Sequence, residues 1–164
     1  METKILTLMR GLSGSGKSQA AREIEQCNKG VVIVSTDDFW RGDNGNYTFD
    51  YSRIGDAHLW AQRKTEEWMK CNQPHIVVDN TNARWWEMFP YIEMAKKYSY
   101  EVNVHMVGDT NPEVIPLYAA RNIHNVPIDI IQRQAKNFEK LMDPEMGYFL
   151  EKLRREIENK LKNG

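Results

Sequence analysis

Short apolar runs alternate with longer segments of helical period along most of the chain. This alternation is typical of a parallel sheet with helices on both faces, a three-layer α/β/α fold of roughly four or five strands. Val31–Val34 is a continuous apolar run, as in strands buried on both faces. Tyr100–Val107 alternates apolar and polar residues, which favours an edge strand. The other predicted strands are Ile5–Met9 and His75–Val78.

Apolar residues at helical spacing predict the helices between and after these strands. Helices are expected over about 52–72 and 84–98, with Pro90 near the start of the second or at a kink, while 41–51 is rich in Gly, Asn and Asp and is predicted as a loop. Asn111 and Pro112 are a typical helix start. Three further apolar stripes are Ala20, Ala21, Ile24 and Cys27; Ile128, Ile131, Ala135, Phe138 and Leu141; and Met146, Phe149, Leu150, Leu153, Ile157 and Leu161. The last two helices are expected to cover one face of the sheet.

Length and composition predict one domain, residues 1–164, with no repeat or linker inside it. The net charge of -1 argues against broad, non-specific nucleic-acid binding and leaves room for a local basic groove. Cys27 and Cys71 form no C-x-x-C pair and are predicted to be thiols. No apolar run has the length of a membrane span, so a cytoplasmic protein without membrane contact is expected.

The stretch GLSGSGKS at residues 11–18 fits the phosphate-loop pattern G-x-x-x-x-G-K-[ST], between a predicted strand and a helix. Backbone N–H groups of such a loop surround a triphosphate, the lysine reaches the β and γ oxygens, and the hydroxyl after it binds Mg²⁺. A glycine-rich turn with an incidental lysine is a poor alternative. The predicted ATP-binding residues are Gly11, Ser13, Gly14, Ser15, Gly16, Lys17 and Ser18, with Ser18 also on Mg²⁺.

Acidic residues follow two of the predicted strands, at the edge where ligands bind in open parallel sheets. In Ser35-Thr36-Asp37-Asp38, one aspartate is a candidate general base for an attacking hydroxyl. A helix cap or turn is the alternative. In Asp79-Asn80-Thr81-Asn82, the acid is a candidate for holding Mg²⁺, binding the acceptor or capping the next helix.

Cations and aromatic rings supply further candidates. Arg121, near the end of a predicted helix, is placed to neutralise a transferring phosphoryl group, and His124 to contact phosphate, although both also fit structural roles. Arg41 and Arg53 are candidates for acceptor phosphates. The rings near the predicted cleft are candidates for stacking on a base, with core packing as the commoner alternative: Trp40, Tyr47, Phe49, Tyr51, Trp85 and Trp86.

Five motifs in this order, GLSGSGKS, STDDF, VVDNTN, ARNIHNVP and the helix PIDII, resemble the 5′-kinase domain of bacteriophage polynucleotide kinase. MRGL, STDDF, DNTN, WEM and RNIH are closer still to the P-loop kinase domain of vertebrate proteins that bind a HECT-type ubiquitin ligase. The resemblance covers residues 4 to about 141. It implies an adenylate-kinase-like P-loop fold with strand order 2-3-1-4.

The resemblance also implies ATP- and Mg²⁺-dependent transfer of the γ-phosphate to the 5′-hydroxyl of DNA or RNA. Asp37 is then the general base, Asp79 lies in the acceptor site with Asp38 and Asn82 as further contacts, and Arg121 begins a lid at about 121–127, followed by helices over about 127–162. The phage enzyme has an arginine where Trp40 stands here, one residue before Arg41. A kinase of a small acceptor and a nucleotide-switched binding module remain as alternatives.

Overall fold

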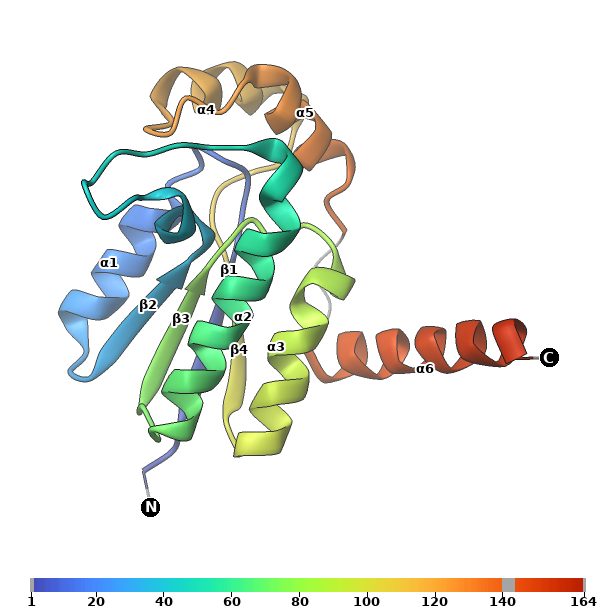
Figure 1. Cartoon of the computed structure of the whole chain (residues 1–164). Helices are drawn as coiled ribbons and strands as arrows, with labels where there is room; N and C mark the ends of the chain where they lie inside the picture. The colour runs from blue at the N-terminus through green and yellow to red at the C-terminus, as the bar shows by residue number, and fades with distance from the viewer. Residues whose placement is uncertain (1, 140–143, 164) are drawn as a thin grey trace.

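The computed structural model describes residues 2–139 and 144–163, which contain a four-stranded parallel sheet in the order β2-β3-β1-β4 (Figure 1). The strands are β1 (Ile5–Arg10), β2 (Val31–Ser35), β3 (His75–Asp79) and β4 (Glu101–Met106). Every pairing between neighbouring strands is parallel. The predicted α/β class and strand order are confirmed.

Helices cover the sheet on both faces. α1 (Lys17–Cys27) packs on one face with Met9 and Val77, while α2 (Ile54–Lys70) and α3 (Trp85–Tyr98) pack on the other with Leu8 and Val78. Successive strand residues therefore enter different cores, because side chains alternate across a sheet. This gives the expected three layers, with the carboxyl ends of all four strands along one edge.

The two outer strands differ in how well the sequence predicted them. β4 lies at one edge, and its alternating exposed and half-buried residues agree with the prediction of an edge strand. β2 lies at the other edge, where Val32 and Ile33 are only half-buried. The prediction that this strand is buried on both faces was therefore only partly right, since in the described residues β3 is its one partner strand.

Two helices form a cap over the carboxyl edge of the sheet. α4 (Ile115–Arg121), which follows the short η3 turn (Pro112–Val114), lies beside α5 (Ile128–Lys136) above the strand ends (Figure 1). Ile115, Tyr118 and Ile131 form a small core with Leu12 of the glycine loop. This core places the cap directly on the predicted phosphate site.

The last helix, α6 (Pro144–Asn163), packs on α3 near its start and then extends away from the sheet. Tyr148 stacks on Phe89 with ring centroids 5.4 Å apart. The prediction that α5 and α6 together cover one sheet face is therefore wrong, because α5 packs on the glycine loop instead. The apolar residues of the α6 stripe are exposed: Phe149, Leu150, Leu153, Ile157 and Leu161. Leu141 and the side chain of Met146 lie outside the described part of the chain.

Smaller differences concern element ends. The predicted helix over 52–72 begins as a 3-10 turn, η2 (Tyr51–Arg53), before α2, and Pro90 lies inside α3. Another 3-10 turn, η1 (Thr36–Trp40), follows β2 directly.

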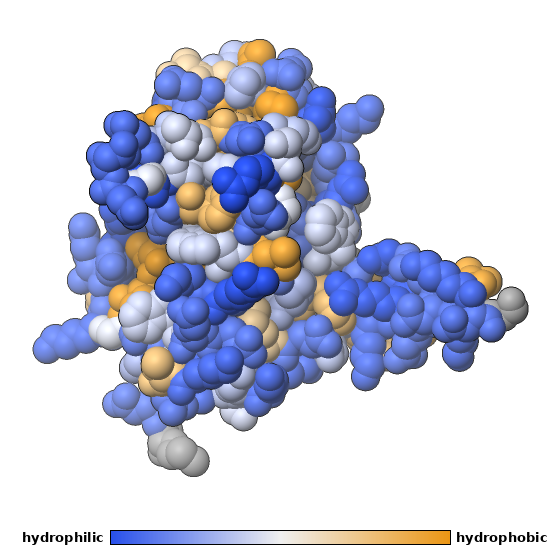
Figure 2. Space-filling view, viewed as in Figure 1, coloured by the Kyte–Doolittle hydropathy of each residue, from blue (hydrophilic) through white to orange (hydrophobic). Residues whose placement is uncertain are grey.

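In the view of Figure 2, α6 is a largely hydrophilic projection with a hydrophobic patch near its C-terminal end. Within residues 2–139 and 144–163, no helix is both long and apolar enough to cross a bilayer.

Candidate active site

The glycine loop connects β1 to α1 at the carboxyl edge of the sheet. Gly14 and Gly16 have φ angles of 82° and 101°, in the left-handed region that favours glycine. A Cβ atom at Gly14 would also collide with the backbone carbonyl of Tyr118 in the cap. The loop therefore needs glycine here both for its own conformation and for its contact with α4.

Lys17 and Ser18 begin α1, where the helix dipole favours a bound anion. The Lys17 Nζ atom donates a hydrogen bond to the carbonyl of Leu12 at 3.0 Å. Burial lowers the pKa of Lys17, against the opposing effect of the Asp79 and Asp37 carboxylates. The lysine is thus held inside the loop, among the groups that would meet the phosphates.

Asp79, the last residue of β3, accepts a hydrogen bond from the Ser18 hydroxyl at 2.8 Å between Oγ and Oδ2. Burial raises the pKa of Asp79, and the nearby Lys17 ammonium and Ser18 hydroxyl oppose that effect. A carboxylate and a hydroxyl oxygen side by side are the ligand types that Mg²⁺ takes in proteins, usually together with phosphates and water. Ser18 and Asp79 therefore fit a magnesium ion bound with a nucleotide.

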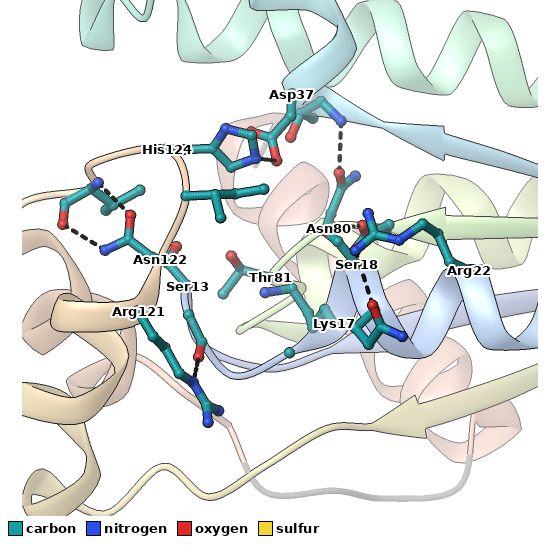
Figure 3. A pocket seen from close by; sticks show the side chains of 17 residues that line it. Ser13, Lys17, Ser18, Arg22, Asp37, Asn80, Thr81, Arg121, Asn122 and His124 are labelled. Carbon is teal, nitrogen blue, oxygen red and sulfur yellow. Dashed lines mark hydrogen bonds and ion pairs between the residues drawn. The ribbon is translucent and has the colours of Figure 1, made fainter.

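A cavity of about 280 Å³ lies between the glycine loop, the ends of β2 and β3, and the connection after α4. Figure 3 shows Asp37 on the side of the cavity opposite Lys17 and Ser18. The described residues that line it are Ser13, Gly14, Gly16, Lys17, Ser18, Gln19, Arg22, Thr36, Asp37, Asp79, Asn80, Thr81, Arg121, Asn122, Ile123, His124 and Val126.

Both carboxylate oxygens of Asp37 have a polar side chain within 3.3 Å. The Tyr47 hydroxyl lies 3.3 Å from Oδ1, and His124 Nε2 lies 3.1 Å from Oδ2. The Tyr47 and His124 rings stack on each other, with centroids 4.9 Å apart and planes inclined by 23°. His124, predicted as a phosphate contact, lines the cavity and lies beside Asp37; its contact with phosphate stays a prediction.

Arg121, the last residue of α4, lies over the glycine loop. Its Nε atom donates to the carbonyl of Gly14 at 2.6 Å and its Nη2 atom to that of Ser15 at 3.0 Å. The guanidinium also lies 5.0 Å from the centroid of the Tyr118 ring. Arg121 thus lies against the predicted phosphate loop, and its role in neutralising a transferring phosphoryl group stays a prediction.

Residues 6–141 match the AAA domain family, which is more than half of the chain. The chain belongs to the AAA domain family. Human NEDD4-binding protein 2 is 39% identical over 139 residues, which are 84% of this chain and 8% of that protein. The chain therefore spans less than a tenth of the length of that relative.

Two solved structures resemble this AAA domain in fold. In the Pnkp1/Rnl/Hen1 RNA repair complex, the match covers 84% of this chain and 45% of the other, with a TM-score of 0.66 and 17% identity. A gluconokinase from Sinorhizobium meliloti 1021 matches over 85% of this chain and 78% of its own, with a TM-score of 0.55 and 13% identity. The family resemblance seen in the sequence is confirmed. Family and fold support a nucleotide-dependent kinase, and the family implies ATP use.

Four predicted acceptor contacts of this AAA domain lie outside the lining of the cavity. Asn82 is buried, and its amide donates to the carbonyl of Met9 at 2.8 Å. Arg53 is exposed, pairs with Asp56 at 3.2 Å and lies over Phe39. Asp38 follows Asp37 in η1, and burial raises the pKa of Asp38 against the opposing charge of Arg41.

The aromatic candidates divide between core and surface. Trp40 and Trp85 are buried, as the packing alternative expects. Phe49, Tyr51 and Trp86 have exposed rings. Tyr47, proposed from the sequence only as a stacking ring, is the one that contacts Asp37.

Sequence reasoning missed two residues of this AAA domain that hold the site together. Gln134 on α5 makes two hydrogen bonds with Ser13, both 3.0 Å long. Its side-chain oxygen accepts from the Ser13 N–H, and its side-chain nitrogen donates to the Ser13 hydroxyl. Asn80 accepts a hydrogen bond from the N–H of Thr36 at 3.0 Å and so ties the ends of β2 and β3 together. The position of Asn80 next to Asp79, in a polar cluster after a strand, could have predicted a role in the site. A single glutamine on an amphipathic helix, such as Gln134, gives no such indication.

Proposed function

We propose that this chain is an ATP-dependent polynucleotide 5′-hydroxyl kinase, which transfers the γ-phosphate to the 5′ end of DNA or RNA. The observation that carries the proposal is the position of Asp37 across one cavity from Lys17 and Ser18. A carboxylate that faces the phosphate loop and is open to the cavity suits proton removal from an acceptor.

In this mechanism the glycine loop and Lys17 bind the β and γ phosphates of ATP. Ser18 and Asp79 would hold Mg²⁺, which neutralises charge on the phosphates when bound. Asp37 takes the proton of the acceptor hydroxyl while the acceptor oxygen forms its bond to the γ-phosphorus. The bond from that phosphorus to the bridging oxygen breaks, and ADP leaves with the electron pair. Arg121 stabilises charge on the transferring group.

The acceptor assignment rests on the resemblance to polynucleotide kinases and on the likeness to a structure of an RNA repair complex. Asp38, Arg41 and Arg53 stay predicted acceptor contacts, which require a substrate reaching beyond the cavity. The same role for Asn82 would also require its buried side chain to become exposed. Residues 121–127 serve as the lid of a single domain spanning 1–164.

Cys27 and Cys71 are free and exposed, which suits a reducing cytoplasm.

A kinase of a small acceptor is the second candidate, because a gluconokinase shares the fold over most of its own chain. The test offers γ-labelled ATP and Mg²⁺ with 5′-hydroxyl oligonucleotides of DNA and RNA. Parallel reactions contain nucleosides or gluconate, and oligonucleotides that already carry a 5′-phosphate serve as the control. We expect label on the 5′-hydroxyl oligonucleotides and none on the control. Label on a small acceptor alone would replace the proposal with the second candidate.

A further inference from the structure

Asp37 is contacted by two side chains that come from different segments of the chain. Tyr47 belongs to the loop over 41–51, and His124 belongs to the connection between α4 and α5. The Tyr47 hydroxyl donates a hydrogen bond to Oδ1 of Asp37, and His124 Nε2 lies within ion-pair distance of Oδ2. Burial and the adjacent Asp37 carboxylate raise the pKa of Tyr47, which keeps its hydroxyl protonated as a donor.

The Tyr47 and His124 side chains also support each other. Their rings stack at 4.9 Å, so each holds the other over the carboxylate. The side chain of His124 is 21% exposed and that of Asp37 34%, which leaves the carboxylate reachable from the cavity. Each carboxylate oxygen has a second lone pair, so Asp37 can accept a further proton while both contacts persist.

The connection that carries His124 is anchored to the glycine loop at its other end. Arg121, three residues before His124, donates hydrogen bonds to the carbonyls of Gly14 and Ser15. Asn122 accepts a hydrogen bond from the N–H of Val126 at 2.8 Å, which closes the connection into a compact turn. One short segment thus touches the phosphate loop with Arg121 and Asp37 with His124.

We propose that Tyr47 and His124 are positioning residues that orient the Asp37 carboxylate, and that they latch the loop over 41–51 to the connection over 122–127. The Asp37 carboxylate then faces the acceptor only when this connection is closed over the glycine loop. The kinetic part of this inference rests on the proposed function of Asp37 as the base. The latch itself does not.

The first arm of the test measures the latch by hydrogen–deuterium exchange, without any acceptor. Thr48 in the loop donates its N–H to the carbonyl of Trp40, and Val126 donates to Asn122, so both segments contain protected amides. In His124→Ala we expect exchange in both segments to rise by about tenfold, because each then opens independently. The matched control is Asp43→Asn, an exposed change within the same loop. Unchanged exchange over 41–51 in His124→Ala would overturn the proposal.

The second arm measures steady-state kinetics with a 5′-hydroxyl oligonucleotide. Tyr47→Phe keeps the ring stack and loses one donor, and His124→Gln keeps an N–H donor that His124→Ala lacks. We expect kcat to fall by about tenfold to a hundredfold in His124→Ala, as for a slightly misplaced reacting group, with the KM for ATP within about twofold. Tyr47→Phe and His124→Gln should lie between this variant and the wild type.

The arms separate the two proposals. If kcat stays within about twofold of the wild-type value in both His124→Ala and Tyr47→Phe, the positioning role is overturned, even if the latch exists. A wild-type protein that labels no oligonucleotide would overturn the proposed function instead. The exchange arm would still decide whether the latch is present.

Discussion

Lys17 is an ammonium group enclosed by the glycine loop, where burial lowers its pKa. A buried charge costs stability unless its partners compensate fully, and the lowered pKa means that they do not. We expect Lys17→Met to melt no lower than the wild type without nucleotide, and to lose the rise in Tm that Mg²⁺ and ATP cause. Thermal melts with and without nucleotide measure both effects.

The control for this change is Lys29→Met, which removes an exposed lysine. It should keep the nucleotide-induced rise in Tm. A Lys17→Met protein that still gains the full rise would contradict the role of Lys17 in phosphate binding.

Arg121 reaches two carbonyls of the glycine loop with one guanidinium, a geometry that a lysine cannot reproduce. We expect Arg121→Ala and Arg121→Lys both to lower kcat, by at least about tenfold, because the charge or its fixed placement is lost. Steady-state rates with saturating ATP measure this. Wild-type kcat in Arg121→Lys would show that a positive charge is sufficient and that the two contacts are dispensable.

Individual residues differ in how far the sequence could predict them. Lys17 and Ser18 stand in a motif whose spacing follows from how a loop surrounds phosphate, so they were predictable. Asp37 was one of two adjacent aspartates: the pattern alone left both open, the family resemblance favoured Asp37, and the fold places Asp37 but not Asp38 in the lining of the cavity. Tyr47 contacts Asp37, ten positions away, and Gln134 contacts Ser13, 121 positions away. No local sequence pattern predicts such contacts.

Helix α6 depends on a close approach between Gly147 and the ring of Trp85. A Cβ atom at Gly147 would lie 2.5 Å from Trp85 Cε3. We expect Gly147→Ala to lower the free energy of unfolding by about 1–3 kcal/mol through overpacking, and to speed proteolysis within α6. Denaturant unfolding and limited proteolysis measure the two effects, and nucleotide binding should not change.

Gly55 provides a matched control, because a Cβ atom there meets nothing within 4 Å and the residue also lies in a helix. Gly55→Ala should stabilise the protein by roughly 0.5–1 kcal/mol, the usual gain of alanine over glycine in a helix. If both substitutions stabilise equally, the packing of α6 on α3 is not as described.

The element predictions succeeded where hydrophobic period decides and failed where packing partners decide. Strands and helices were predictable because buried positions repeat along them. The period of α5 shows that one face is apolar, but the partner of that face, Leu12 in the glycine loop, lies far away in the sequence. For the same reason, the apolar stripe on α6 could not reveal that its residues would be exposed.

Which class of acceptor the protein binds depends on surface charges outside the cavity. With a net charge of -1, attraction to nucleic acid must come from a local group of cations such as Arg41 and Arg53. We expect the KM for a 5′-hydroxyl oligonucleotide to rise about tenfold between about 50 and 200 mM salt, the effect of roughly two phosphate contacts. The KM for ATP should change far less. Equal salt dependence for both substrates would favour a small acceptor.

The central claim is that Asp37 makes this P-loop fold a transferase to 5′-hydroxyl ends. The direct measurement compares wild type and Asp37→Asn for transfer of label from γ-labelled ATP to a 5′-hydroxyl oligonucleotide, with nucleotide binding followed by thermal shift. We expect 5′-end labelling by the wild type, a loss of at least about a hundredfold in the variant, and an unchanged thermal shift. Transfer by Asp37→Asn at the wild-type rate, or no labelled oligonucleotide from the wild type, would contradict this claim.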